Sequence, residues 1–347
     1  MESQVRPRRA FRADAAAAVA GAGAKAAFWT AAGSAVRKIA RTEDAPVKLT
    51  SDAPPPPKGY LRRVWIEAFE KDAADVAAGL YPLAEKFDGD PAAVWRRTRD
   101  LLTDAHEVQR RRVEGAATEA RAESTSAYPT YYRQNFHYQS GGWFTQQSAR
   151  RYEAQVEALF AGATGPMRRR ALSLLARAWR DRDQRSLKLV DIACGSGAFL
   201  ADLKAAFPRA AVMGLDLSST YLAEARARSG ASGVQALAEK LPFADASLDG
   251  LTCVYLFHEL PPKIRPLVAA EMARVLKPGG VLALADAIQA DRAPELARPL
   301  AAFPAFFHEP YFESYQATDL VALFAGVGLT LKGRDDAFLT QALLFEK

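Results

Sequence analysis

Two acidic residues and a pair of glycines have the types and spacing of a nucleotide-binding site. An apolar run over 187–192 contains Asp191 and leads into a turn with Gly195 and Gly197, where the backbone can approach a ligand closely. The next apolar run ends at Asp216, 19 residues after Gly197, a separation typical of an acid that binds ribose hydroxyls. Together with the amide groups that begin the following helix, these residues predict an adenosine-type ligand.

The elements that must position these residues alternate between strand and helix from residue 186 onward. Strands are expected over 187–192, 211–215, 234–237, 250–256 and 280–285 and near 328–333 and 338–345, with helices over 198–207, 219–228, 263–276 and 316–326. That alternation predicts a doubly wound α/β sheet over 186–347. Ligands of such sheets bind at the carboxyl ends of the strands.

The first half of the chain divides into three further parts. Residues 1–58 are expected to be a disordered or targeting extension that ends in a proline-rich linker, and an organelle transit peptide and a bacterial extension both fit its composition. Residues 59–127 are expected to form a helical domain. Residues 128–185 combine an aromatic segment with cap helices, and the rings either cover a substrate pocket or dock the helices onto the sheet.

Charge and cysteine content limit the possible partners. Residues 1–185 hold 31 Lys and Arg against 22 Asp and Glu, whereas residues 186–347 hold 15 against 18. The basic half could meet nucleic acid or an anionic membrane, but its alternating signs favour solvated helix faces. Cys194 and Cys253 suggest no disulfide framework and fit a reducing compartment. No apolar stretch is long enough to span a membrane, so we expect a cytoplasmic protein, or an organelle protein if residues 1–45 are a transit peptide.

Five segments, taken together and in order, resemble a class I S-adenosylmethionine-dependent methyltransferase. They are Asp-Ile-Ala-Cys-Gly-Ser-Gly at 191–197, Gly-Leu-Asp-Leu-Ser at 214–218, Ala-Glu-Lys-Leu-Pro-Phe at 238–243, Phe-His-Glu-Leu at 257–260 and Val-Leu-Lys-Pro-Gly-Gly at 275–280. The chain is most similar to the methyltransferases of ubiquinone and menaquinone biosynthesis, over about 160 residues of its C-terminal half. The resemblance implies a Rossmann-like, seven-stranded doubly wound sheet, S-adenosyl-L-methionine as cofactor and a small-molecule acceptor.

The resemblance also implies roles for individual residues on the cofactor side. The cofactor-binding set would be Asp191, Ala193, Cys194, Gly195, Ser196, Gly197, Asp216, Leu217, Ala238, Glu239 and Tyr255. Within it, the turn would surround the methionine part, Asp216 would bind both ribose hydroxyls, and Leu217 would lie against adenine. Two positions depart from the family pattern, since Ala193 replaces a glycine and Leu237 replaces an acid that would contact the adenine amino group.

Candidates for acceptor chemistry lie in the aromatic segment and after the later strands. His258 is the candidate general base, because an imidazole titrates near neutrality, although a loop histidine bonded to a carbonyl is an equally common role. The candidate substrate residues are Tyr132, His137, Trp143, His308, Tyr311 and Tyr315, which could alternatively be packing residues. His137, His258 and His308 share no short ligand spacing, so no metal site is expected.

Competing functions are distinguished by what the motifs lack. A dinucleotide dehydrogenase is disfavoured because Leu200 occupies the third position after Gly197, where its fingerprint has glycine. No Asn/Asp-Pro-Pro-aromatic motif follows the fourth strand, so no nucleic-acid substrate is expected. The sequence therefore predicts methyl transfer to a small, aromatic or quinone-like acceptor. The alternative is a non-catalytic cofactor-binding regulatory or assembly protein, and the oligomeric state stays open.

Overall fold

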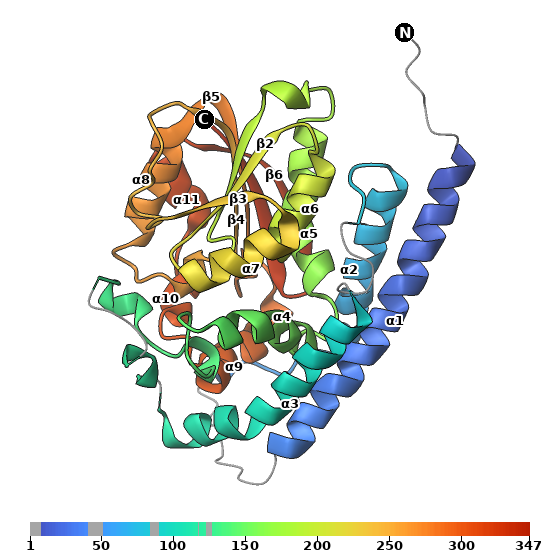
Figure 1. Ribbon diagram of the computed structural model, residues 1–347, viewed down its shortest axis with the longest axis vertical. Coiled ribbons are helices and arrows are strands. Elements are labelled where there is room, and N and C mark those ends of the chain that lie inside the picture. Colours follow the sequence, from blue (N-terminus) through green and yellow to red (C-terminus); the bar gives the residue numbers. More distant parts are fainter. Residues whose placement is uncertain (1–7, 41–50, 84–89, 117, 123–126) are drawn as a thin grey trace.

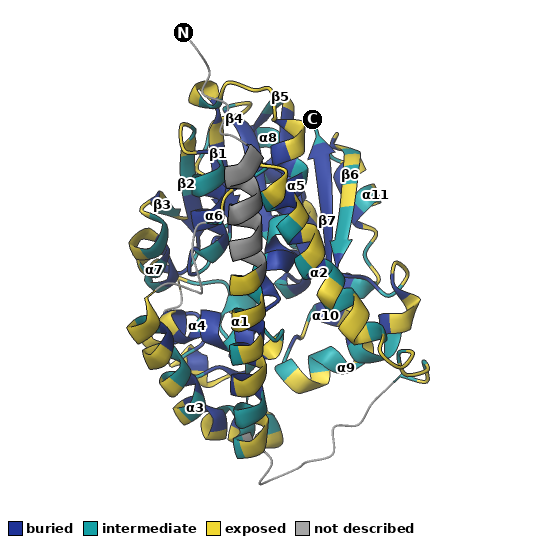
Figure 2. Cartoon of the chain, turned by 90° about the vertical axis from the view of Figure 1, so that its right-hand side faces the viewer, coloured by how far each residue is buried: buried dark blue, intermediate teal, exposed yellow. Residues whose placement is uncertain are grey.

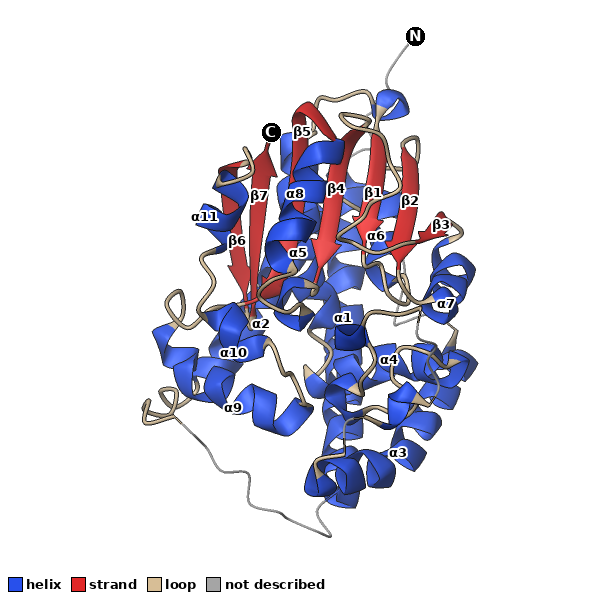
Figure 3. Cartoon of the chain, turned by 90° about the vertical axis from the view of Figure 1, so that its left-hand side faces the viewer, coloured by secondary structure: helices blue, strands red, loops and turns tan. Residues whose placement is uncertain are grey.

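The computed structural model describes residues 8–40, 51–83, 90–116, 118–122 and 127–347, and for residues 8–19 and 40 it describes the helix but not the side chains. Seven strands form one sheet in the order β3-β2-β1-β4-β5-β7-β6. The strands are β1 (Lys188–Ile192), β2 (Ala211–Asp216), β3 (Ser232–Gln235), β4 (Leu248–Val254), β5 (Leu276–Ala287), β6 (Thr330–Ala337) and β7 (Thr340–Glu346). Strands β1 to β5 pair in parallel and β7 pairs antiparallel with both neighbours, as Figure 3 shows. The predicted Rossmann-like, seven-stranded α/β fold is confirmed.

Helices cover both faces of the sheet, and a further helical layer lies beyond one end of its strands (Figure 1). The first five are α1 (Arg8–Ala40), α2 (Tyr60–Ala77), α3 (Pro91–Glu114), α4 (Gln146–Leu159) and α5 (Thr164–Ala178). The others are α6 (Ala198–Ala206), α7 (Ser219–Ser229), α8 (Arg265–Val275), α9 (Ala297–Phe307), α10 (Phe312–Gln316) and α11 (Leu320–Ala325). Short 3-10 turns are η1 (Glu119–Arg121), η2 (Thr130–Tyr132), η3 (Phe136–Tyr138), η4 (Gln184–Ser186), η5 (Phe257–Glu259) and η6 (Pro294–Leu296).

The prediction of a single helix over 316–326 is wrong in its extent. The structure has α10 and α11 there, and Asp319 begins α11 by accepting a hydrogen bond from the amide of Ala322. Helix α9 was not predicted, because Pro304 lies inside it and a proline usually interrupts a helix.

Strand β1 shows how both faces of the sheet are buried. Val190 and Ile192 lie in the core with residues of α8 and α11, whereas Leu189 lies in the other core with residues of α5 and α6. Successive side chains of a strand point to opposite faces, so a continuous apolar run is the expected sequence of a strand covered on both sides. The strand is therefore rigid where it leads into the turn at 193–197.

A helical layer made mainly of α1, α3 and α4 lies beyond the carboxyl ends of the parallel strands, where the arrowheads of β1, β2 and β4 point in Figure 3. Residues 8–40 form one helix, where a disordered or targeting extension was expected, and alanine-rich sequence has high helix propensity. Trp29 is 2% exposed and lies in a core with Val94 and Leu101 of α3 and Ala154 of α4. Figure 2 shows α1 along the outside of the molecule.

Buried ion pairs fasten α2 to the sheet domain. Arg169 of α5 donates two hydrogen bonds to Asp72 of α2, at 2.8 and 2.6 Å, and Arg170 lies 2.9 Å from Asp75. Bidentate contacts of this kind fix orientation as well as distance. They hold the N-terminal helices in a defined position relative to the strands.

Candidate active site

The strand order reverses between β1 and β4, which are paired neighbours in the sheet. In open α/β sheets the crevice at this point, beyond the carboxyl ends of the strands, is where ligands bind. Two segments enter the crevice directly, the turn at 193–197 after β1 and the segment 255–259 after β4. Both carry residues that the sequence singled out.

The turn after β1 has a left-handed backbone at three of its five residues. The φ angles are 56° at Ala193, 53° at Gly195 and 81° at Gly197. A Cβ atom at Gly197 would lie 2.6 Å from the Cα of Ala225 in α7, so glycine is required there by close packing as well as by φ. The turn is thereby packed closely against α7.

Asp216, at the end of β2, holds the turn and faces the crevice. Its Oδ2 accepts a hydrogen bond from the amide of Gly195 at 2.9 Å, and its Oδ1 accepts one from the amide of Ser218 at 2.8 Å. Burial raises the pKa of this carboxyl to about 6. The group is thus a fixed acceptor that still carries its charge at neutral pH.

A first cavity of about 110 Å³ opens between the turn, the ends of β2 and β4 and the aromatic segment 128–144. Nine of the predicted site residues line it: Ala193, Gly195, Asp216, Leu217, Ala238, Glu239, Tyr255, Tyr132 and Trp143. The opposing walls are apolar on the Leu217 and Ala238 side and carry the carboxylate of Asp216 on the other. This is the pairing of surfaces that a nucleoside requires.

The remaining predicted cofactor residues lie behind the turn and support it. Asp191 is 1% exposed and accepts a hydrogen bond from Thr252 Oγ1 at 2.7 Å, and burial raises its pKa to about 7. Cys194 is buried against Gly214, where a Cβ would meet its Sγ at 2.7 Å, and burial raises the pKa of its thiol. Neither Cys194 nor Cys253 forms a disulfide.

Ser196 connects the turn to the cap helices through a residue that the sequence did not reveal. Its Oγ donates to Glu153 Oε1 of α4 at 2.6 Å, and Arg168 of α5 donates to Glu153 Oε2 at 2.8 Å. Burial by itself would raise the pKa of Glu153, but Arg168 outweighs it and holds that pKa at about 2. A charged residue in an amphipathic helix is ordinarily solvated, so no sequence signal marked Glu153.

The aromatic segment both lines the first cavity and docks onto the sheet domain. Tyr131 donates its hydroxyl to Glu239 Oε1 at 2.7 Å, and the carbonyl of Trp143 accepts a hydrogen bond from Ser218 Oγ at 2.5 Å. Tyr131 and Phe136 line the cavity beside Tyr132 and were not predicted. The segment therefore both covers a pocket and docks the cap helices onto the sheet domain, so the two interpretations of its aromatic rings are compatible.

A second, larger cavity of about 410 Å³ lies between α1, α3, α4 and α9. Its walls are mainly apolar, with Leu101 and Val108 of α3, Val156 of α4, and Leu300 and Phe303 of α9 among them. Tyr152, Tyr255 and Glu259 line both cavities. The two spaces therefore meet at these three side chains.

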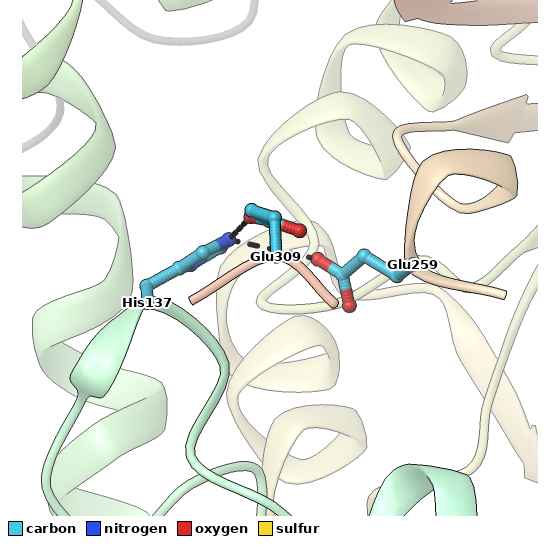
Figure 4. Close-up of side chains that lie close together, drawn as sticks. All are labelled: His137, Glu259 and Glu309. Atoms are coloured by element: carbon cyan, nitrogen blue, oxygen red, sulfur yellow. Dashed lines mark ion pairs between the residues drawn. The ribbon is translucent and has the colours of Figure 1, made fainter. Parts of the chain in front are cut away.

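A cluster of ionisable residues stands at this junction and is drawn in Figure 4. His137 Nε2 lies 2.5 Å from Glu309 Oε1 and 3.8 Å from Glu259 Oε1. Burial lowers the pKa of His137, but the Glu309 carboxylate outweighs it and the net pKa is raised. Burial raises the pKa of Glu259 to about 7, and the charge of Glu309 adds to that effect. The sequence offered His137 and Glu309 as possible substrate contacts, and it favoured a capping or ion-pair role for Glu259.

His258 lies on the wall of the second cavity beside this cluster. Its Nδ1 is 2.5 Å from Asp286 Oδ1, and its Nε2 is 3.9 Å from Glu259 Oε1. Burial lowers the pKa of His258, but the Asp286 carboxylate outweighs it and raises that pKa to about 10. At neutral pH this imidazole is therefore protonated on both nitrogens and positively charged.

Three predicted substrate residues lie outside the linings of both cavities. His308 Nε2 contacts Gln134 Oε1 at 3.0 Å, Tyr311 accepts a hydrogen bond from Arg265 at its carbonyl, and Tyr315 donates its hydroxyl to the carbonyl of Ala287 at 2.6 Å. These contacts stabilise the loop after β5. Tyr132, His137 and Trp143 are the substrate candidates that face a cavity.

Metal binding was not expected from the three histidines. Within the described ranges, ligand atoms of His137, Glu259 and Glu309 lie within 4.8 Å of one another, a spacing that could hold a cation. His258 and His308 are not members of this group. In the same described ranges no helix has both the length and the apolar character needed to cross a membrane.

Comparison with known proteins identifies the segment around the first cavity. Residues 190–284 match the family model described as a methyltransferase domain. This part of the chain is a methyltransferase domain. The matched range contains the turn after β1, Asp216, the 238–239 pair and the 255–259 segment.

Curated relatives match the methyltransferase domain over part of their length. Demethylmenaquinone methyltransferase of Deinococcus radiodurans is 36% identical over 104 residues, 28% of this chain and 42% of the relative. Fatty-acid O-methyltransferase of Mycolicibacterium smegmatis is 34% identical over 125 residues, 35% of this chain and 45% of the relative. The chain thus spans less than half the length of these two relatives. Among solved structures, magnesium protoporphyrin IX methyltransferase of Synechocystis is 14% identical, with 52% of this chain and 79% of that chain covered and a TM-score of 0.38.

Proposed function

We propose that the protein is an S-adenosylmethionine-dependent methyltransferase that transfers a methyl group to a small, aromatic or quinone-like acceptor. The observation that carries the proposal is the position of Asp216. Its buried carboxylate lines the first cavity beside Gly195, in a segment that matches a methyltransferase domain. A nucleoside ribose offers the two hydroxyl donors that such a carboxylate accepts.

The residues of the first cavity suit the whole cofactor. Leu217 and Ala238 supply apolar walls for adenine, and the unpartnered Oε2 of Glu239 is a further buried acceptor on the same side. Trp143 and Tyr152, with Tyr132 nearby, offer ring faces to a cation. These features fit a sulfonium nucleoside.

The chain's own contribution to the reaction is positioning. S-adenosylmethionine, when bound, supplies an electrophilic methyl group that leaves with a neutral thioether behind it. Asp216 and the turn amides fix the nucleoside, and the 128–144 segment covers the cavity and excludes water. Orientation of this kind accounts for roughly 7–11 kcal/mol of barrier in well-aligned reactions. His258 stays the sequence-based candidate base, and with a pKa of about 10 it would act as a base only above that pH.

The non-catalytic alternative is less well supported, because a binding protein needs no second space beside the cofactor. Here Tyr152, Tyr255 and Glu259 line both cavities, so an acceptor bound in the second one would lie beside the cofactor.

Calorimetry with S-adenosylhomocysteine tests the proposal. Replacing Asp216 by Ala removes both hydroxyl contacts, each worth about 1.5–3 kcal/mol as a bond to a charged group, so affinity should fall by about 100-fold or more. Asp181→Ala, at an exposed position, is the matched control and should bind normally. Unchanged affinity in Asp216→Ala, or no binding by the unaltered protein, would contradict the proposal.

A further inference from the structure

The second cavity and Glu309 together specify what kind of acceptor this site takes. We propose, on the basis of the function proposed above, that the acceptor is an elongated apolar molecule with one hydroxyl group. Its apolar body lies in the second cavity and its hydroxyl donates a hydrogen bond to Glu309 at the junction. This assigns Glu309 as the group that accepts the acceptor's proton and His137 as the residue that positions Glu309.

The first argument is the size and lining of the second cavity. At about 410 Å³ it lies within the roughly 300–1,000 Å³ of typical ligand pockets, so it has room for more than a single ring. Its walls come from four helices, and apolar residues such as Val108, Val156, Leu300 and Phe303 contribute most of the surface. An apolar lining of this extent binds a long apolar body, because every methylene taken from water adds affinity.

The second argument is an unsatisfied acceptor at the polar end of that cavity. Glu309 is 2% exposed and lines the second cavity. Its Oε1 is paired with His137, whereas its Oε2 has no hydrogen-bond partner among the described residues. A buried carboxylate oxygen without a donor is costly, and a hydroxyl on the acceptor would supply the missing donor.

The third argument is the arrangement of charge around Glu309. His137 lies 2.5 Å from it, and Glu259, 3.8 Å from the same imidazole nitrogen, lines both cavities. His258, held by Asp286, faces Glu259 from the other side. The oxygen left without a partner belongs to a carboxylate beside the apolar space, so a neutral hydroxyl is favoured over a carboxylate or phosphate, which a carboxylate would repel.

The reaction then balances without a further reactant. The acceptor oxygen forms a bond to the methyl carbon as the carbon–sulfur bond breaks. The electron pair of the carbon–sulfur bond stays on sulfur, which becomes a neutral thioether. The hydroxyl proton passes to Glu309 Oε2 and later to solvent. His137 keeps the carboxylate in place through its contact with Oε1 and does not touch the acceptor.

The test is calorimetric binding of 4-alkylphenols, from methyl to hexyl, to the full chain saturated with S-adenosylhomocysteine. Each added methylene should tighten binding about threefold to fourfold until the cavity is filled. Each phenol is compared with the alkylbenzene of the same chain length. The phenol should bind about tenfold more tightly in the unaltered protein, and that advantage should disappear in Glu309→Gln while the chain-length dependence stays.

Three variants separate the parts of the proposal. Val108→Trp narrows the second cavity and should stop the gain at a shorter chain, whereas Val113→Trp, on the same helix and 38% exposed, should not. His137→Ala should weaken phenol binding but not alkylbenzene binding. His137→Gln, which keeps a donor for Glu309, should recover most of the loss, a rescue that a purely structural role would not give.

The possible failures are distinguishable. A chain-length series without a slope, or no binding of any phenol, overturns the apolar acceptor. A phenol advantage that survives in Glu309→Gln overturns the role of Glu309, provided that this variant binds S-adenosylhomocysteine normally and is therefore folded. If the unaltered protein does not bind S-adenosylhomocysteine, the proposed function itself fails.

Discussion

The two cavities differ in how the chain builds them. The first is made largely by one domain, from turns that follow consecutive strands, and its key groups are backbone amides and Asp216. The second is assembled from helices far apart in the chain, and its polar end joins His137, Glu259 and Glu309 from three separate segments. Local geometry fixes the first space, whereas the second depends on how the helical layer is docked.

The docking of the helical layer onto the sheet domain should be the most sensitive feature. Breaking the contact between them should therefore cause the largest loss in the free energy of unfolding. Glu153→Ala removes the partner of both Ser196 and the buried Arg168, and an unpaired buried charge costs about 3–5 kcal/mol in the free energy of unfolding. Urea denaturation measures this loss. Glu114→Ala, in an exposed ion pair on α3, is the control and should leave stability unchanged. Equal stability of Glu153→Ala and the unaltered protein would show that the layers are joined by other contacts.

The first cavity should instead be sensitive to a single methyl group in its turn. Gly197→Ala would place Cβ 2.6 Å from the Cα of Ala225 at a φ of 81°, adding a packing cost of about 1–3 kcal/mol to about 1–2 kcal/mol for the left-handed backbone. Gly195→Ala, with open space at its Cβ and a φ of 53°, should lose only the cost of the left-handed backbone, about 1–2 kcal/mol. Thermal unfolding of the two variants measures the difference, and equal melting temperatures would mean that α7 does not press on the turn.

The sequence was most informative where the candidate site is built from a contiguous motif. The turn at 193–197 and Asp216 were predicted because glycine spacing and strand ends are local properties. Glu153 could not be assigned, because a buried charge has the same sequence pattern as a solvated one until its partners are known. For the same reason Glu309 could be named only as one possible wall residue and Glu259 only as a capping or ion-pair residue. His308, Tyr311 and Tyr315 lie close in sequence to Glu309, yet they contact Gln134, Arg265 and Ala287 instead of a cavity.

The same distinction applies to the fold. Apolar runs bounded by glycine and charged residues predicted all seven strands, because both faces of each central strand are covered. Helix α1 was not predicted as an ordered element, since its alanines offer a weak apolar stripe. Among residues 20–39, whose side chains the structure describes, Trp29 is the one large residue that is buried. Long-range packing decided that part of the chain.

Acid pH should affect the first cavity in two opposite ways. Burial raises the folded pKa of Asp216 to about 6, so S-adenosylhomocysteine affinity should fall up to about tenfold per unit below pH 6, as the carboxylate is protonated. The ligand-free protein should show the reverse, since an acid with a raised folded pKa adds stability at low pH that is lost as pH rises through 6. Calorimetry from pH 5 to 8 measures the first effect and denaturation the second.

A neighbouring group must be separated from this titration. Asp191 has a pKa of about 7 for the same reason and lies behind the turn. Asp191→Asn should keep the loss of ligand affinity below pH 6. Disappearance of that loss in Asp191→Asn would assign the titration to the supporting residue instead.

The smallest expected effect concerns metal at the junction. The carboxylates of Glu259, Glu309 and Asp286 already face His137 and His258, both with raised pKa values, so the cluster is close to charge balance without a cation. Dialysis against EDTA should leave methyl transfer, measured with radiolabelled S-adenosylmethionine, unchanged within about twofold. A large loss that one divalent metal restores would mean that the three-residue group of His137, Glu259 and Glu309 binds that metal.

The central claim is that the first cavity holds the cofactor and the second the acceptor. A crystal structure with S-adenosylhomocysteine and 4-hexylphenol tests it most directly. The account predicts the nucleoside ribose on Asp216, the phenol hydroxyl on Glu309 and the alkyl chain among α3, α4 and α9. A nucleoside in the second cavity, or a phenol bound away from the junction, would contradict it.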